Sequence, residues 1–231
     1  MASRWKLFLE WGSILSLIAC AYWIFMLTPI ETSQGFSQKI MYLHVPTVIV
    51  TYLAFFIVFA FSIAYLWKRD LMFDRIAKSS AEIGLLFCAL VLISGAVWGR
   101  PTWGTYWVWD ARLTTTLLLF LIFMGYFLLR MSTEDRDKES RLAAVIGIIG
   151  FLDIPIIHKS VEWWRTLHQP TTLFKTEDGM AKPSIPDELL YPLLATMMAM
   201  LLFYLFLLQL RYRMETSQDE LNQLMAQDRM D

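Results

Sequence analysis

The sequence predicts an all-α integral membrane protein with six transmembrane helices, and three observations favour this fold class. Hydrophobic residues make up 57% of the 231 residues, and the mean hydropathy is +0.47. Soluble domains of this size are usually nearer half apolar. Repeated apolar runs of roughly 18 residues match the length that a helix needs to cross a bilayer. No internal repeat or extended linker separates these runs. Residues 1–213 are therefore predicted to form one membrane domain, followed by a polar tail over 214–231.

The apolar runs define six predicted spans, an even number that puts both termini on one side. They lie at 8–28, 44–67, 81–98, 113–130, 142–157 and 188–210. The first resembles a signal peptide in its basic start, but its apolar residues continue through Leu27, which favours a retained anchor. The fifth is short and carries Asp153 and Pro155 near its end.

Lysine and arginine indicate the orientation of the spans, because cytoplasmic loops carry an excess of both. Thirteen of the 20 lysines and arginines lie in the N-terminus, the 68–80 and 130–141 loops and the tail. The other seven lie in the opposite segments, four of them in the longer 158–187 segment, where charge has less influence on topology. Both termini, the polar tail included, are therefore predicted to be cytoplasmic.

This topology places every histidine of the chain on the outer face. His44, His158 and His168 are all predicted there, and so is the tryptophan-rich loop at 98–112 between the third and fourth helices. His158 and His168 belong to the outer segment 158–187. A single outward-facing site would require this arrangement.

Several classes of function are disfavoured by the composition. The net charge is −1 and there is no basic tract, so nothing indicates a nucleic-acid partner. Cys20 and Cys88 lie inside apolar runs, without a CxxC or CxxCH motif, which disfavours covalent haem attachment to this chain. No nucleophile lies beside a base and no phosphate loop is present, so we do not expect an enzyme.

Residues 103–114, WGTYWVWDARLT, concentrate aromatic rings beside a charged pair. Scattered tryptophans are typical of the membrane interface. Here four tryptophans cluster around residues that shape a loop entry: Trp98, Trp103, Trp107 and Trp109, beside Gly99, Pro101 and Gly104. From Trp103 onward we expect a short helix that aligns Trp103, Trp107 and Asp110 on one stripe. The stripe would form an apolar platform with an acid at one end.

A platform of this kind suits a large, flat, apolar ligand with charged edges. Porphyrin fits this description, because its macrocycle packs on aromatic rings and its propionates favour arginine or lysine. A quinone head would fit the rings but has no anionic edge. Arg112 is the first candidate for a propionate contact, followed by Arg100 and Arg165.

The histidines are candidate ligands for a haem iron. In IMYLHVP, His44 lies two residues before Pro46, which suits the first turn of a helix. Read as a helix, IIHKSVEWWRTLHQP (156–170) places Trp164 and His168 on one stripe. His158 and His168 would then lie roughly 15 Å apart along the axis, so only one of them could share an iron with His44.

Of these two histidines, His168 is the better partner for His44 because it follows a tryptophan pair, whereas a structural role fits His158 better. Two neutral imidazoles on opposite faces give a six-coordinate haem iron. A zinc site, which Asp110 or Glu162 could complete, would leave the aromatic cluster without a role.

Taken together, WGTYWVWDARLT, YLHVP (42–46) and PIIHKSVEWWRTLHQ (155–169) resemble the CcmC branch of the tryptophan-rich "WWD" haem-handling superfamily of cytochrome c biogenesis. The three motifs occur in the family's order, and the resemblance covers most of the chain. At Asp153 and Arg165 the chain departs from the family pattern, where an asparagine is common.

The resemblance implies a multi-pass protein of the bacterial inner membrane that binds haem b transiently and non-covalently at the periplasmic face. It implies that the haem is presented to the haem chaperone CcmE, with CcmD, the CcmA/CcmB ATP-binding cassette complex and membrane lipid as further partners. The axial ligands carry over to His44 and His168. The other residues assigned to the haem are Trp103, Trp107, Trp109, Asp110, Arg112 and Trp164.

Two alternative functions remain at this point. A membrane cytochrome b-type electron carrier usually places its histidine pairs inside the spans, whereas these histidines lie at span ends. A permease for haem or another solute should show intramembrane charges or broken helices along a path.

Overall fold

The structure is a computed structural model, and it describes residues 4–132, 135–168, 175–177, 180–182 and 185–228. Its helices are α1 (Arg4–Tyr22), α2 (Met41–Lys68), α3 (Leu71–Trp103), α4 (Ala111–Met131), α5 (Arg136–Trp163) and α6 (Asp187–Asp228). All six are long and apolar enough to cross a membrane. The predicted all-α fold with six transmembrane helices is therefore confirmed.

Shorter elements lie between the long helices. A π-helical turn, Trp23–Leu27, extends α1, and a 3₁₀ turn, Phe36–Ile40, leads directly into α2. Between α5 and α6, strands β1 (Lys175–Glu177) and β2 (Met180–Lys182) form an antiparallel hairpin that was not predicted from the sequence.

Several helices are longer than the apolar runs that predicted them. Because α2 begins at Met41, Pro46 lies in its second turn, and its predicted place in the first turn is wrong. The last helix continues to Asp228, so most of the polar segment after residue 213 is helical. That segment contains neither glycine nor proline, and loss of hydrophobicity alone does not end a helix.

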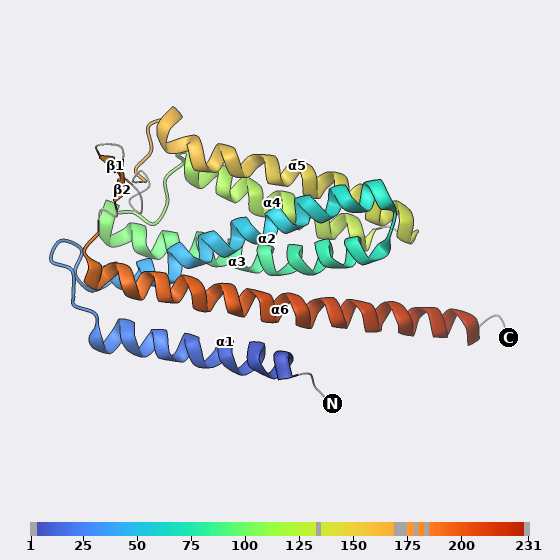
Figure 1. The fold of residues 1–231 in the computed structure, drawn as a ribbon. Helices are drawn as coiled ribbons and strands as arrows, with labels where there is room; N and C mark the ends of the chain where they lie inside the picture. Colours follow the sequence, from blue (N-terminus) through green and yellow to red (C-terminus); the bar gives the residue numbers. More distant parts are fainter. Residues whose placement is uncertain (1–3, 133–134, 169–174, 178–179, 183–184, 229–231) are drawn as a thin grey trace.

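Helices α2, α3, α4 and α5 form a bundle, with α6 beside it and α1 packed against α6 (Figure 1). In the centre of the bundle Phe55 of α2 stacks on Phe123 of α4, with ring centroids 3.7 Å apart. Both rings are fully buried. Figure 1 also shows that α1 begins on the side away from the α3–α4 loop, and that α6 extends past the rest of the bundle on that side.

Charged residues join the helices at the end of the bundle opposite this loop. The guanidinium of Arg130 on α4 lies 2.5 Å from Asp74 of α3 and 2.8 Å from Glu139 of α5. It also donates a hydrogen bond to the Tyr126 hydroxyl at 2.7 Å. All of these charged groups are buried, so each needs the others as partners. The cluster links α3, α4 and α5.

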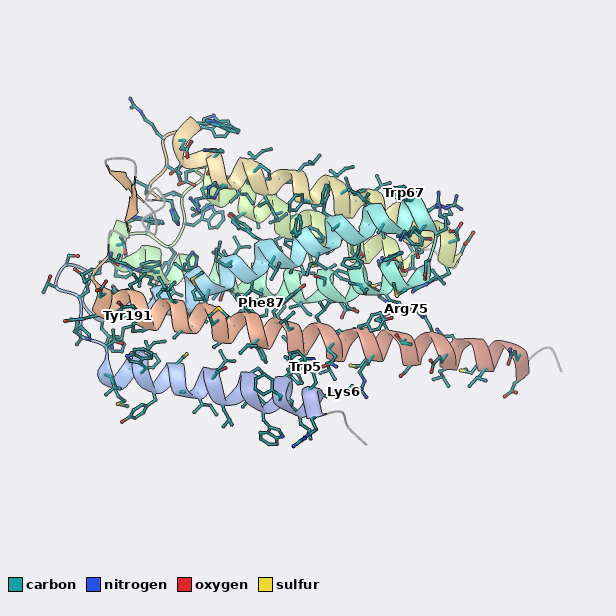
Figure 2. All side chains as sticks on the ribbon, viewed as in Figure 1. Trp5, Lys6, Trp67, Arg75, Phe87 and Tyr191 are labelled. Carbon is teal, nitrogen blue, oxygen red and sulfur yellow. The ribbon has the colours of Figure 1, made fainter. Side chains whose placement is uncertain are left out.

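A second set of ion pairs holds the extended part of α6 against α3. Lys78 of α3 lies 2.6 Å from Glu215, and Arg75 lies 3.4 Å from Asp219. Figure 2 shows Arg75 on the part of the bundle that faces α6. Glu215 and Asp219 are one helical turn apart, so both pairs stabilise the same face of α6. These contacts explain why α6 stays helical beyond its apolar run.

Replacement of Arg130 by methionine should lower the free energy of unfolding by about 3–5 kcal/mol. It leaves two buried carboxylates, Asp74 and Glu139, with only the longer ion pairs to Arg136 at 3.4 and 3.5 Å. The matched control is Arg141→Met, which removes an exposed pair with Asp137 and should change the free energy by less than about 1 kcal/mol. Equilibrium unfolding in detergent micelles measures both values. Equal losses in the two variants would contradict the structural role of the buried cluster.

Candidate functional site

The main pocket lies at the α3–α4 loop end of the bundle, and residues of α2, α3, α4 and α5 line it. Its lining includes three histidines, three tryptophans and one arginine: His44, His158, His168, Trp98, Trp103, Trp107 and Arg112. A mostly apolar pocket with a few convergent polar groups is the usual form of a small-molecule site. Histidines that are far apart in the sequence thus face one space.

His44 is buried in the first turn of α2, with 8% of its surface exposed. Its Nδ1 lies 2.9 Å from the Ser94 hydroxyl of α3, and its ring meets Trp98 edge-on at 5.8 Å. His168 and Arg112 line the same pocket as His44. Helix α3 therefore holds the imidazole in one orientation while the ring borders the pocket.

Gly95 lets the imidazole of His44 lie directly against α3. A Cβ atom at Gly95 would be only 3.0 Å from His44 Cε1, closer than nine in ten such contacts in proteins. A larger residue at this position would therefore displace the ring or the helix.

Trp98 is positioned by the loop between α1 and α2, through a turn built on Glu31. The Glu31 carboxylate accepts hydrogen bonds from the backbone N–H groups of Ser33 (2.9 Å) and Gln34 (2.6 Å). Gln34 Oε1 in turn accepts a bond from Trp98 Nε1 at 3.0 Å. The N–H groups of Ser33 and Gln34 hold the pKa of Glu31 below its ordinary value. The carboxylate therefore stays charged to a lower pH than an ordinary glutamate would.

The tryptophan loop is irregular, and the short helix predicted from Trp103 onward is wrong. Helix α3 ends at Trp103, and Gly104 follows with φ of 80°, in the left-handed region. Glycine readily adopts this conformation and is the residue that most often ends a helix in this way. The Arg100 side chain donates to the Gly104 carbonyl and lies over the Tyr106 ring. Of the predicted loop 98–112, only residues 104–110 are therefore outside helices.

Trp107 enters the pocket from this irregular loop. The Thr105 hydroxyl donates to the Trp107 carbonyl at 3.1 Å and closes a local turn. The indole Nε1 of Trp107 is buried and has no hydrogen-bond partner among the described residues. A buried donor without a partner is unfavourable, so an acceptor on a ligand would stabilise it. Trp109 meets Trp107 edge-on at 5.4 Å but is 76% exposed.

Asp110 joins two separate segments with its two carboxylate oxygens. Oδ1 accepts a bond from the Leu113 N–H at 2.9 Å and so caps the first turn of α4. Oδ2 accepts from the Leu167 N–H at 3.2 Å, one residue before His168. Aspartate is a favoured N-cap, so the bond to Leu113 is common at the start of a helix. The bond to Leu167 is unusual because it joins two distant segments of the chain. Through it, Asp110 holds the segment that carries His168.

The helix predicted across 156–170 ends at Trp163, so Trp164 and His168 do not share a helical stripe. Trp164 is extended, with φ of −130° and ψ of 160°, and the chain turns toward Asp110. His168 is half-buried and meets Trp103 edge-on at 6.1 Å. Residues 169–174, 178–179 and 183–184 of the predicted histidine segment lie outside the described residues.

Five of the eight residues expected from the sequence line this pocket, and three do not. The lining contains His44, His168, Trp103, Trp107 and Arg112, and within the described chain it leaves out Trp109, Asp110 and Trp164. Trp164 is 52% exposed and contacts Trp163 edge-on at 5.8 Å. His158, for which a structural role was expected, is part of the lining.

Arg112 reaches the pocket from the first turn of α4, next to the Tyr52 hydroxyl of α2. Among the described residues, no carboxylate forms an ion pair with it. The pocket therefore combines a cation available to an anionic group, aromatic walls and imidazole nitrogens.

Comparison with known proteins gives consistent matches. The CcmC family, described as "Heme exporter protein C", matches residues 1–227. Heme exporter protein C of Bradyrhizobium diazoefficiens is 39% identical over 205 residues, which cover 86% of this chain and 75% of the relative. The Haemophilus influenzae protein of the same name is 40% identical over 200 residues, covering 86% and 79%. A putative cytochrome c biosynthesis ccmC-like mitochondrial protein of Marchantia polymorpha is 36% identical over 163 residues, covering 71% and 68%.

Replacement of Gly95 by alanine should weaken haem binding by about tenfold or more, because the new methyl group displaces the His44 ring. Gly125→Ala is the matched control, since a Cβ at this α4 position meets nothing within 4 Å. Titration of the purified variants with haem, followed at the Soret band, gives both affinities. If the two variants bind haem equally well, the close contact at Gly95 does not control His44.

Asp110→Asn should leave α4 capped but release the His168 segment. Asparagine is also a good N-cap, yet its amide would present an N–H₂ group to the Leu167 N–H in place of an acceptor. We expect near-normal thermal stability and a visible haem spectrum that differs from that of the wild type, because the segment that lines the pocket moves.

The matched control is Asp135→Asn, which alters the N-cap of α5, where Asp135 accepts from Asp137 and Lys138. This variant should keep the wild-type spectrum. The bridging role of Asp110 would be refuted if both variants had the same spectrum.

Proposed function

The chain belongs to the CcmC family, heme exporter protein C, and from this premise we propose how its pocket handles haem in cytochrome c biogenesis. In this proposal the protein binds haem b non-covalently, with the iron between His44 and His168. It presents the haem to the chaperone CcmE at the periplasmic face of the bacterial inner membrane.

The observation that carries the proposal is the presence of His44 and His168 in one pocket with aromatic walls. The two residues come from different segments, α2 and the chain after α5, so their rings can approach an iron from different sides. Two neutral imidazoles are a common ligand set for haem iron. Trp103 and Trp107 supply apolar surface for the macrocycle, since flat aromatic rings favour such contacts.

Arg112 is the proposed partner of a haem propionate. It lines the pocket and has no carboxylate partner among the described residues. Arg100 is a weaker candidate because its guanidinium already binds the Gly104 carbonyl, and Arg165 is exposed on the irregular segment. The buried Nε1 of Trp107 is a further donor for a propionate oxygen.

The cysteines support non-covalent binding. Covalent attachment of haem in c-type cytochromes uses a CxxCH motif, which this sequence lacks. Cys88 is one of the residues that line the pocket, and its thiol donates to the Thr116 carbonyl at 3.9 Å. Because a carrier must release its ligand, we assign the acceptance of the haem to CcmE. We assign the supply of energy to CcmA/CcmB, and CcmD is a further proposed partner.

The exposed tryptophans fit a role at the edge of the site. Trp109 contacts Trp107 while keeping most of its own surface exposed. We assign Trp109 to the rim, where it could contact the exposed edge of the haem or the partner that receives it. Trp164 is exposed beyond the end of α5 and suits the membrane interface.

Visible spectra of purified protein from haem-supplied cells test this proposal. Wild-type protein should show a low-spin, bis-histidine spectrum. His44→Ala and His168→Ala should each convert it to a high-spin form or lose the haem, because each removes one axial ligand. The matched control is His158→Ala, which changes a pocket histidine that we do not assign to the iron and should remain low-spin.

The functional test measures the assembly of c-type cytochromes in cells whose only copy of this protein is one of the variants. We expect loss of assembly for the His44 and His168 variants and retention for the His158 variant. A low-spin spectrum that persists without His168 but disappears without His158 would move the second ligand to α5. Absence of any Soret band in the wild-type protein would overturn the haem assignment.

A further inference from the structure

The hydroxyl of Ser94 occupies a defined position between two hydrogen-bonding groups. It lies 2.6 Å from the Leu90 carbonyl, one turn earlier on α3, and 2.9 Å from His44 Nδ1 on α2. Ser94 and His44 are 7% and 8% exposed, respectively. Water has little access to this contact, so the protein itself determines which atom carries each proton.

The short contact with Leu90 fixes the direction of both bonds. A serine hydroxyl has one hydrogen, and two oxygen atoms 2.6 Å apart need a proton between them. The hydroxyl therefore donates to the Leu90 carbonyl and uses a lone pair toward His44. Consequently His44 Nδ1 carries the hydrogen and donates it to Ser94, and the other ring nitrogen, Nε2, has a free lone pair.

We propose that Ser94 is a positioning residue that holds His44 in the tautomer able to bind haem iron through Nε2. This inference rests on the proposed function, in which His44 is an axial ligand. Ligating histidines generally donate their second ring N–H to an acceptor, which fixes both the tautomer and the ring orientation. Ser94 provides this acceptor before haem arrives.

The surroundings of His44 support a site built for this orientation. Ser94, Gly95 and Trp98 all belong to one stretch of α3, and each contacts the imidazole in a different way. Ser94 binds Nδ1, Gly95 leaves room beside Cε1, and Trp98 meets the ring edge-on. Together they restrict rotation of the imidazole about the Cα–Cβ and Cβ–Cγ bonds of His44.

A hydroxyl acceptor also has a consequence for the strength of the iron bond. A carboxylate in this position would draw the Nδ1 proton more strongly and make the imidazole a stronger donor to iron. The neutral Ser94 hydroxyl orients His44 with less increase in its donor strength. A haem carrier needs this combination, because its ligand must be oriented for binding yet leave during transfer.

The test compares Ser94→Ala with Ser94→Thr, which keeps a hydroxyl, in purified full-length protein titrated with ferric haem. Ser94→Ala should weaken binding by about 10- to 100-fold and raise the midpoint potential of the haem that remains bound. The potential rises because His44 becomes a poorer donor to the ferric iron. Ser94→Thr should restore both values to near wild type.

Ser80→Ala is the matched control for loss of a buried serine hydroxyl from α3. Ser80 binds the Ala54 carbonyl at 2.7 Å and the Tyr204 hydroxyl at 2.8 Å, and it is not part of the pocket lining within the described chain. We expect wild-type affinity and potential for this variant. A general loss of packing would therefore appear in both alanine variants, whereas the loss of the acceptor affects only Ser94→Ala.

His44→Ala separates failure of this inference from failure of the proposed function. The inference is overturned if His44→Ala loses the low-spin spectrum while Ser94→Ala keeps wild-type affinity and potential. It is also overturned if Ser94→Thr matches Ser94→Ala, because then the hydroxyl is not the effective group. If His44→Ala itself keeps the low-spin spectrum, the proposed function fails, and the role of Ser94 fails with it.

Discussion

The carboxylate of Asp110 is the contact on which the pocket depends, because it connects the two segments that must meet there. One oxygen starts α4, and the other holds the backbone of Leu167, 57 residues away in the chain. The next residue, His168, thereby reaches the pocket that His44 borders from α2. The aspartate of the tryptophan motif acts through geometry, since it does not itself line the pocket within the described residues.

The two histidines are held in different ways, and the difference suits a protein that binds and releases a ligand. His44 lies within a helix and is fixed by the neighbouring helix, through Ser94 and Gly95. His168 lies on an irregular segment after α5 and is placed through its neighbour Leu167. In a bilayer, irregular backbone occurs mainly where a protein meets water or lines a cavity. The site therefore combines a rigid half from the spans with a half built by loops at their ends.

Hydrophobicity in the sequence was sufficient to predict the six spans, because repeated apolar runs of membrane length are rare in soluble domains. Predictions from helical periodicity were wrong beyond the ends of α3 and α5. Gly104 ends the first of these helices, and the Asp110–Leu167 contact that holds the chain after α5 is not visible in local sequence. Ser94 was not predicted, because its hydrogen bond with His44 depends on how α2 packs against α3. The one available signal was its position a single turn before Trp98.

A structure of the haem-loaded protein would show whether one haem iron lies between His44 and His168. We expect both histidines within bonding distance of the iron, His44 through Nε2, with its Nδ1 still beside Ser94. We also expect the macrocycle to lie against Trp103 and Trp107. An iron bound by His158, or a haem outside this pocket, would contradict the assignment of His44 and His168 as axial ligands.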